Sequence, residues 1–272
     1  MKKICMTGGR GKIGSYLSKL GAIDLECDVT NTLEIQRSIK YYKPDIIVHL
    51  ASKSDVNWCE KRENEQKVID VNFSAVSKVC SEAEKVGCQV VLISSDHVFP
   101  GGFWSGKYKE DDNRKPLNFY GTTKVAAEGL TSIYSNLKIV RTSYLFDESR
   151  LRWDLDGMKK GYIAEFPTFI RRTFMYLPHF ALSMMNYLQR LDDMPEILHI
   201  SGSNSVSWYE FMLDLAKAYG HHESLVLPRK KDLQNGFAPR GKNLGLNTSL
   251  AMRLGFHKYS YLDGLQAMVN DE

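Results

Sequence analysis

Four apolar runs divide the first 145 residues of the chain, and helical stretches lie between them. The runs are "KKICMTGG", "PDIIVHLAS", "QVVLISSD" and "LKIVRTSYLF", and each holds apolar residues without polar alternation. Apolar positions return at helical spacing over 31–42, 63–86 and 120–134, and briefly in "IGSYLSKL". Continuous apolar strands that alternate with helices are typical of a parallel sheet covered on both faces. The pattern therefore predicts an α/β fold with a doubly wound parallel sheet over residues 1–146.

The pattern changes after Phe146. Residues 150–172, "RLRWDLDGMKKGYIAEFPTFIRR", are rich in aromatic and basic side chains and predict irregular structure. Helices are expected at 178–191, in "SVSWYEFMLDLAKAYG", where Ser207 and Glu210 form a capping box, and in "NTSLAMRLGF". "EILHISG" predicts a strand that could join the main sheet. We expect residues 147–272 to form a smaller, mixed lobe that binds the substrate, with some segments returning to the main sheet.

Composition places the chain among ordinary globular proteins. Of its 272 residues, 43% are hydrophobic and 25% are charged, and the net charge is +4. This charge is too small for the dense basic face of a nucleic-acid-binding protein, so we expect no nucleic-acid partner. One basic cluster lies near the C-terminus, and it is either solvated surface or a clamp for an anionic ligand: Arg229, Lys230, Lys231, Arg240 and Lys242.

The cysteines and the lengths of the apolar runs indicate in which cellular compartment the protein is expected. The five cysteines are scattered and odd in number, and none forms a C-x-x-C pair: Cys5, Cys27, Cys59, Cys80 and Cys88. This usage favours free thiols in a reducing cytoplasm. We also expect no secretory signal and no membrane partner, since no apolar run is long enough to span a bilayer.

The segment "TGGRGKIG" follows the first apolar run and opens a helix, with Gly8, Gly11 and Gly14 three residues apart. Glycines allow a tight turn and let a diphosphate approach the backbone. The helix N-terminus then offers free N–H groups and a positive dipole end to the phosphates. We therefore predict a dinucleotide site here.

The region after this turn bears on which dinucleotide binds. Dinucleotide folds usually carry a carboxylate for the adenosine ribose about 20 residues past the glycines. In "SKLGAIDLECDVTN" the second strand must be very short, and the acidic candidates are Asp24, Glu26 and Asp28. We assign Asp28 to the adenine and find no clear ribose carboxylate. Arg10, inside the turn, could meet a 2′-phosphate, which favours NADP(H), with NAD(H) as the alternative.

A serine, a tyrosine and a lysine lie on two neighbouring elements. Tyr120 and Lys124 are four residues apart on one helix face, and Ser95 ends a central strand at the edge where open α/β sheets bind ligands. We expect the Lys124 ammonium to lower the pKa of the Tyr120 phenol. A tyrosine of this kind can exchange a proton with a substrate oxygen, which suits reduction of a carbonyl beside a nicotinamide.

With these motifs in place, the chain resembles extended short-chain dehydrogenases/reductases, and among them dTDP-4-dehydrorhamnose reductases and related nucleotide-sugar reductases. The resemblance covers nearly the whole length. It rests on "DVTNTLEIQRSIKYYKPDIIVHLASKSDVNWCE", "SSDHVFPG", "YKEDD", "KPLNFYGTTKVAAE", "IVRTSYLF" and "APRGKNLGL", although Gly241 replaces the usual proline. It implies an NADP(H)-dependent enzyme that reduces a 4-keto-6-deoxy sugar nucleotide in deoxysugar or polysaccharide biosynthesis, and it allows a homodimer.

The resemblance also assigns roles to residues. The catalytic residues would be Ser95, Tyr120 and Lys124. The cofactor would be held by Gly8, Arg10, Gly11, Lys12, Ile13, Gly14, Asp28, Val29, Ala51, Ser52, Lys53, Tyr120 and Lys124. Thr142 and Ser143 would end the strand beside the nicotinamide. The substrate would meet Val56, Ser95, Asp96, Tyr144 and Arg240.

Several alternatives stay open. A 4-epimerase could use the same three catalytic residues. The non-catalytic β subunit of methionine adenosyltransferase, which binds NADP, resembles the same family. A 4,6-dehydratase is disfavoured, because His97 follows Asp96 where that chemistry needs a second acid. His49 lies inside an apolar strand and is expected to pack there, and no residues with metal-ligand spacing accompany His221 and His222, so we expect no metal.

Overall fold

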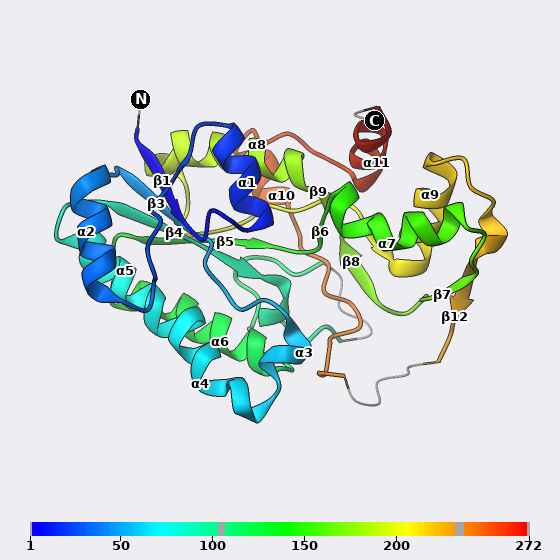
Figure 1. Cartoon of the computed structure of the whole chain (residues 1–272), viewed down its shortest axis with the longest axis horizontal. Coiled ribbons are helices and arrows are strands. Elements are labelled where there is room, and N and C mark those ends of the chain that lie inside the picture. The colour runs from blue at the N-terminus through cyan, green and yellow to red at the C-terminus, as the bar shows by residue number, and fades with distance from the viewer. Residues whose placement is uncertain (1, 103–106, 232–236, 271–272) are drawn as a thin grey trace.

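A six-stranded parallel sheet forms the centre of the molecule. The computed structural model describes residues 2–102, 107–231 and 237–270. The sheet has the order β10-β5-β4-β3-β1-β2, and its strands β5, β4, β3 and β1 are labelled in Figure 1. Its strands are β1 (Ile4–Thr7), β2 (Ile23–Asp24), β3 (Ile46–His49), β4 (Gln89–Ser95), β5 (Leu137–Thr142) and β10 (Ile197–His199), and every pair is parallel. The predicted doubly wound parallel sheet is confirmed, as is the very short second strand.

Helices cover both faces of the sheet, since alternate strand residues point to opposite faces. On one face, α1 (Lys12–Lys19), α8 (Leu177–Gln189) and α10 (Ser249–Arg253) pack on residues such as Met6 and Val48. On the other face, α2 (Thr32–Tyr42), α5 (Ala75–Glu84) and α6 (Phe119–Glu128) pack on residues such as Cys5 and Ile47. Continuous apolar strands are needed because both faces are buried.

The expected helix at 63–86 is built from several pieces. A short helix α3 (Val56–Cys59) lies before this range. A 3₁₀ turn at Arg62–Asn64 then leads into α4 (Glu65–Ile69), which runs through a π-helical turn at Asp70–Ser74 into α5. Such turns insert an extra residue and often lie at functional sites. Here the turn carries Asn72, whose side chain is buried below the loop that follows β3.

The smaller lobe has its own aromatic core. It contains α7 (Glu148–Lys159), α9 (Trp208–Ala218), α11 (Tyr261–Asn270) and short strand pairs, namely β7 (Ala164–Pro167) with β12 (Val226–Arg229), and β8 (Arg171–Thr173) with β11 (Ser205–Ser207). At its centre Phe174 and Phe211 stack with ring centroids 4.2 Å apart. A third pair, β6 (Leu145–Phe146) with β9 (Met175–Tyr176), connects this lobe to the main sheet.

Two elements of the smaller lobe differ from the expectation. Residues 150–172 do not form an irregular segment throughout, because α7 covers much of them. The Asp147 side chain accepts a hydrogen bond from the Arg150 backbone N–H over 2.8 Å and starts this helix. Leu151, Leu155 and Met158 then return at helical spacing and are buried. The C-terminal helix α11 was not expected at all.

The two halves of the chain are interleaved. The strand β10 lies at the edge of the main sheet beside β5, and α8 packs across α1. Residue 146 therefore marks the end of the alternating strand–helix pattern. The separation of the chain into two domains remains a prediction.

All five cysteines are free thiols, four of them buried. Burial raises the pKa of the Cys5 thiol to about 11, so it stays protonated at neutral pH. Within the described residues, no helix is both long enough and apolar enough to cross a bilayer.

Candidate active site

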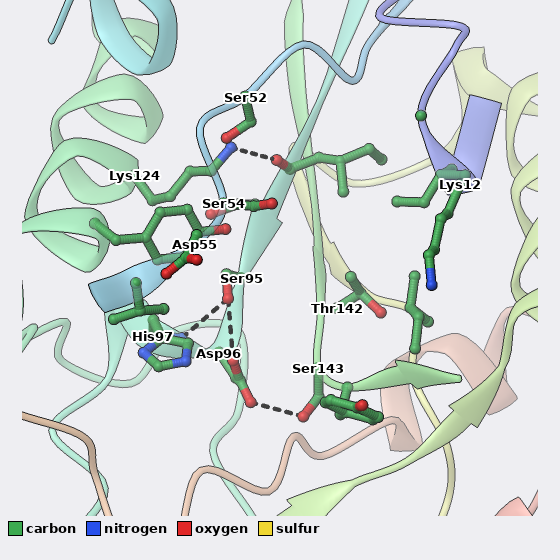
Figure 2. Close-up of a pocket in the computed structure, with 18 of the residues that line it drawn as sticks. Lys12, Ser52, Ser54, Asp55, Ser95, Asp96, His97, Lys124, Thr142 and Ser143 are labelled. Carbon is green, nitrogen blue, oxygen red and sulfur yellow. Dashed lines mark hydrogen bonds between the residues drawn. The ribbon is translucent and has the colours of Figure 1, made fainter. Parts of the chain in front are cut away.

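A cavity of about 760 Å³ opens at the carboxyl ends of the parallel strands. Its walls come from the loops after β1, β3, β4 and β5 and from the smaller lobe, which contributes Ile170, Arg172, Trp208 and Arg240. Figure 2 shows Ser95, His97 and Lys124 on one side of this space and Lys12 across from them. Open α/β sheets bind ligands in this position.

The glycine turn forms the first wall. Gly8 has a φ of +71°, and a Cβ there would lie 2.8 Å from the Ala51 nitrogen. A Cβ on Gly14 would lie 2.4 Å from the Gly9 oxygen, so both positions require glycine. Gly11 begins α1 without a side-chain cap, and its own Cβ would meet only the Gly8 oxygen at 3.2 Å. The first turn of α1 contains no acidic residue, so its free N–H groups suit a diphosphate.

The loop after β3 forms the second wall, and Asn72 holds its shape. The Asn72 Oδ1 accepts from the Lys53 backbone N–H over 2.8 Å and from the Ser52 hydroxyl over 3.0 Å. Its Nδ2 donates to the Lys53 carbonyl over 3.0 Å. One buried side chain therefore fixes both sides of the turn that was assigned to the cofactor. Sequence reasoning did not identify Asn72.

Asp24 lies directly against the glycine turn. It ends β2, and a Cβ on Gly9 would come within 2.5 Å of its carboxylate. This is the strand-end position that a ribose carboxylate takes in dinucleotide folds. Asp28 is exposed, and its carboxylate accepts from the Thr30 N–H and hydroxyl, which lowers its pKa. The assignment of Asp28 to adenine stays a prediction, and Asp24 is the better placed carboxylate for the ribose.

Tyr120 and Lys124 share the buried face of α6, as expected from their spacing. Asn118 begins this helix by accepting the Gly121 N–H over 2.8 Å. The Lys124 Nζ donates to the Ile93 carbonyl over 3.0 Å and lies 5.8 Å from the centroid of the Tyr120 ring. Both side chains line the cavity although little of either is exposed, 8% of Tyr120 and 3% of Lys124.

The pKa of Tyr120 departs from the expectation. Burial raises the pKa of the phenol above its usual value, and Ser95, which lowers it by a hydrogen bond, does not offset this. Burial also lowers the pKa of Lys124, to about 8. Burial therefore outweighs the lowering that was expected from Lys124, and the expectation of a low pKa for Tyr120 is wrong for this structure. A neutral tyrosine that keeps its proton is suited to donating it.

The Ser95 hydroxyl is already engaged. It donates to Asp96 Oδ1 over 3.0 Å and accepts from the His97 backbone N–H over 3.3 Å (Figure 2). The other carboxylate oxygen of Asp96 accepts from the Ser143 hydroxyl over 2.6 Å and lies 3.5 Å from Arg172 Nε. Ser95 can therefore donate to a substrate oxygen only after its hydroxyl rotates away from Asp96.

Three arginines from different parts of the chain face the cavity: Arg150, Arg172 and Arg240. Arg240 donates to Asn57 Oδ1 over 2.9 Å and to the Ala238 carbonyl over 3.1 Å, so its guanidinium is held in place. Arg150 lies over the Tyr144 ring at 4.4 Å. The rest of the basic cluster does not line the cavity, since Lys230, Lys231 and Lys242 are exposed and Arg229 lies on β12. Only Arg240 of that cluster remains available for an anionic ligand here.

Most of the predicted site residues meet in this one cavity. Those that line it are Gly8, Gly11, Lys12, Ile13, Gly14, Ser52, Val56, Ser95, Asp96, Tyr120, Lys124, Thr142, Ser143, Tyr144 and Arg240. Five predicted cofactor residues do not: Arg10, Asp28, Val29, Ala51 and Lys53. Sequence reasoning missed Arg150, Arg172, Trp208 and His97 as lining residues. His97 lies in the motif "SSDHVFPG" but was considered only as the replacement of a dehydratase's second acid, and no motif of the resemblance contains the other three.

The residues that line the cavity fit a dinucleotide. The Thr142 hydroxyl is buried without a hydrogen-bond partner among the described residues, and it lines the cavity where the nicotinamide was expected. No group of three His, Cys, Asp or Glu residues in the described ranges could hold a metal. His49 packs within the sheet, with its Nδ1 3.0 Å from the Thr7 hydroxyl.

Comparison with known proteins identifies the family. The model of the RmlD substrate binding domain matches residues 1–154, which is more than half of the chain. The chain belongs to the RmlD substrate-binding domain family. Among the relatives of this RmlD-family chain, the spore coat polysaccharide biosynthesis protein SpsK of Bacillus subtilis is 27% identical over 239 residues, covering 83% of this chain and 82% of SpsK. The dTDP-4-dehydrorhamnose reductase of Aggregatibacter actinomycetemcomitans is 32% identical over 159 residues, covering 54% of this chain and only 53% of the reductase.

Solved structures agree on the fold of this RmlD-family chain. A dTDP-4-dehydrorhamnose reductase from Bacillus anthracis in complex with NADP superposes with a TM-score of 0.90 at 24% identity, covering 100% of both chains. The UDP-glucose 4-epimerase of Thermus thermophilus in complex with NAD gives a TM-score of 0.78 at 16% identity, covering 98% of this chain and 97% of the epimerase. These structures confirm the fold, and the family match and the named relatives confirm the resemblance to dTDP-4-dehydrorhamnose reductases and related nucleotide-sugar enzymes.

Proposed function

We propose that the protein reduces the keto group of a 4-keto-6-deoxy sugar nucleotide with NADP(H), as a step in deoxysugar or polysaccharide biosynthesis. The observation that carries this proposal is the buried Tyr120 beside Lys124 in the cavity that also holds the glycine turn. Relatives named as dTDP-4-dehydrorhamnose reductases support the same reaction.

The side chains divide the work between them. Bound at the glycine turn, the nicotinamide cofactor supplies the hydride that reduces the carbonyl carbon. Tyr120 donates its phenolic proton to the carbonyl oxygen as that oxygen gains negative charge. Lys124, as an ammonium, stabilises the phenolate that Tyr120 leaves behind. Ser95 and Asp96 position the sugar next to Tyr120.

The cofactor proposal is NADP(H), with NAD(H) as the alternative. The NADP complex of the Bacillus anthracis reductase supports the first, and the NAD complex of the Thermus epimerase supports the second. Exposed Arg10 could pair with a 2′-phosphate, whereas the Asp24 carboxylate beside Gly9 would favour an unphosphorylated ribose. The substrate's two phosphates would be met by Arg240 and by Arg150, which lines the same cavity, because arginine binds phosphate oxygens bidentately.

A substrate screen tests the reaction. The purified chain is mixed with NADPH and with dTDP-, UDP-, GDP- and CDP-linked 4-keto-6-deoxy sugars, and NADPH oxidation is followed at 340 nm, the nicotinamide absorbance band. We expect one nucleotide series to be reduced, and Tyr120→Phe to lower kcat about 10²- to 10⁴-fold with cofactor binding kept. Full turnover by Tyr120→Phe would show that another group donates the proton.

Other outcomes point to the remaining alternatives. Interconversion of two 4-hydroxy sugars without net NADPH loss would make the protein an epimerase. Tight NADP binding with no turnover of any keto sugar would favour a non-catalytic partner of another enzyme. A cytoplasmic location and a homodimer also stay proposals, for which fractionation and light scattering are the direct measurements.

A further inference from the structure

His97 stands beside the proposed proton donor but has no role in the reaction described above. It follows Ser95 and Asp96 in a short 3₁₀ turn after β4 and lines the cavity (Figure 2). Its ring meets the Tyr120 ring edge-on, with centroids 5.7 Å apart and an interplanar angle of 78°. His97 and the proposed proton donor therefore lie next to each other on the wall of one cavity.

Asn118 fixes which nitrogen of His97 carries a proton. The Asn118 Oδ1 accepts the Gly121 backbone N–H over 2.8 Å, and its Nδ2 donates to the Pro239 carbonyl over 2.8 Å. A backbone N–H can only donate and a carbonyl can only accept, so the amide cannot be flipped. The second hydrogen of Nδ2 points at His97 Nδ1, 3.1 Å away. This Nδ1 must therefore be the unprotonated, accepting nitrogen.

The proton of the ring is then on Nε2. Burial lowers the pKa of His97 to about 4; Asp96 raises it, and Arg172 and Arg240 lower it further, so the ring is neutral at pH 7. Among the described residues Nε2 has no hydrogen-bond partner, and this nitrogen is accessible to solvent. The result is an N–H donor with no acceptor in the described part of the chain, on a residue that lines the cavity.

We propose that His97 Nε2–H donates a hydrogen bond to the hydroxyl on carbon 3 of the sugar and so selects substrates that carry it. This inference rests on the proposed reduction at carbon 4. Of the two carbons next to that keto group in a 6-deoxy sugar, only carbon 3 carries a hydroxyl. A neutral N–H donor favours a substrate with an oxygen at carbon 3. A 3-deoxy substrate binds less well because it leaves the N–H unpaired, and a substrate with a 3-ammonium group binds less well because that group can only donate.

Kinetics with paired substrates test the selection. The wild type is expected to reduce the 3-hydroxy substrate about tenfold more efficiently, in kcat/KM, than its 3-deoxy analogue. His97→Phe keeps a flat ring beside Tyr120 but has no donor, so the two substrates should become nearly equal. His97→Gln, whose amide NH₂ can take the place of Nε2–H, should restore part of the preference. If His97 has only a structural role, its replacement should lower kcat/KM for both substrates by the same factor and leave their ratio unchanged. That outcome would overturn the proposal.

Nitrogen NMR on protein with ¹⁵N-labelled histidine tests the donor without any substrate. At pH 7.5 we expect His97 in the neutral form with Nε2 protonated and Nδ1 bare. Asn118→Asp places a carboxylate oxygen opposite Nδ1 and should move the proton to Nδ1 or charge the ring. An imidazolium or an Nδ1-protonated ring in the wild type would contradict the inference. If no keto sugar is reduced but NMR shows the Nε2–H form, the proposed function is wrong and the assignment of His97 as a donor is kept. Failure of the proposed function can therefore be told apart from failure of this inference.

Discussion

Ser95 at the end of β4 is paired with Thr142 at the end of β5 in the register of the central sheet. The residues that follow these two strand ends, Asp96 and Ser143, are joined by a side-chain hydrogen bond, in which the Ser143 hydroxyl donates to Asp96 over 2.6 Å. Arg172 from β8 lies 3.5 Å from the same carboxylate oxygen. One buried carboxylate therefore joins the two central strands to the smaller lobe, in the middle of the candidate site.

Removing this charge should destabilise the fold. In Asp96→Asn the buried Arg172 guanidinium loses its counter-ion, and we expect the free energy of unfolding to fall by about 3 kcal/mol. Ser143→Ala is the matched control, since it removes one hydrogen bond and leaves the ion pair, and should cost about 1 kcal/mol. Urea unfolding of both variants gives the comparison. Equal losses would mean that the ion pair contributes nothing beyond a hydrogen bond.

Gly11 should be essential for the cofactor and dispensable for the fold. Its backbone has a φ of −74°, which any residue can adopt, and a side chain there meets only the Gly8 oxygen before it enters the cavity. Gly11→Val should therefore fold normally and weaken NADPH binding at least about tenfold, because the side chain occupies the path of the diphosphate. Gly129→Ala, at an exposed glycine with nothing within 4 Å, is the control. Affinity for NADPH is measured by fluorescence titration. An unchanged affinity in Gly11→Val would show that the diphosphate does not bind at this turn.

Asp24 and Arg10 should act in opposite directions on cofactor choice. Asp24→Asn removes the negative charge beside Gly9 and should raise the preference for NADPH over NADH, because a carboxylate repels a 2′-phosphate. Arg10→Ala should lower that preference. The readout is the ratio of dissociation constants for the two cofactors in each variant. If Arg10→Ala weakens both cofactors by the same factor, Arg10 does not meet the 2′-phosphate.

The pH dependence of turnover should follow Lys124. Its pKa is lowered to about 8, so the ammonium is lost as pH rises past that value, whereas Tyr120, whose pKa is raised, keeps its proton. We expect kcat/KM for the reduction to be flat between about pH 6 and 7.5 and to fall above about 8. In Lys124→Arg the guanidinium does not titrate in this range, so any remaining activity should lack this fall. The same fall in Lys124→Arg would assign it to another group.

The sequence predicted the parts of the site that depend on local pattern. The apolar runs that became β1, β3, β4 and β5, and the glycine turn between β1 and α1, lie within short stretches whose period and composition are visible along the chain. Ser95, Tyr120 and Lys124 were placed because a strand end and one helix turn determine where such side chains point.

Contacts between distant segments account for what the sequence did not predict. Arg172 and Asp96 are 76 positions apart, and Asn118 meets Pro239 across 121 positions, so no local pattern brings them together. Burial of Tyr120 reversed the expected direction of its pKa, and burial depends on the whole fold. The helix α7 was missed for a local reason, since its basic and acidic residues hid three buried apolar positions that follow the Asp147 cap.

Three histidines with lowered pKa values should make the protein sensitive to acid. Burial lowers the pKa of His49 and of His199 to about 3 and that of His97 to about 4, whereas in the unfolded chain all three titrate near 6.5. As the pH falls below about 6.5, the unfolded state therefore binds up to three more protons than the folded state, so this contribution to stability is complete above that pH and is lost as the pH falls. Each histidine costs up to about 1.4 kcal/mol per pH unit, which gives a slope near 4 kcal/mol per unit for the three. Urea unfolding at pH 7.5, 6.0 and 5.0 measures this slope. His199→Asn should lower it by about a third, whereas replacement of exposed His222 by Asn should leave it as it is. A flat profile down to pH 5 would mean that the three rings accept protons without unfolding.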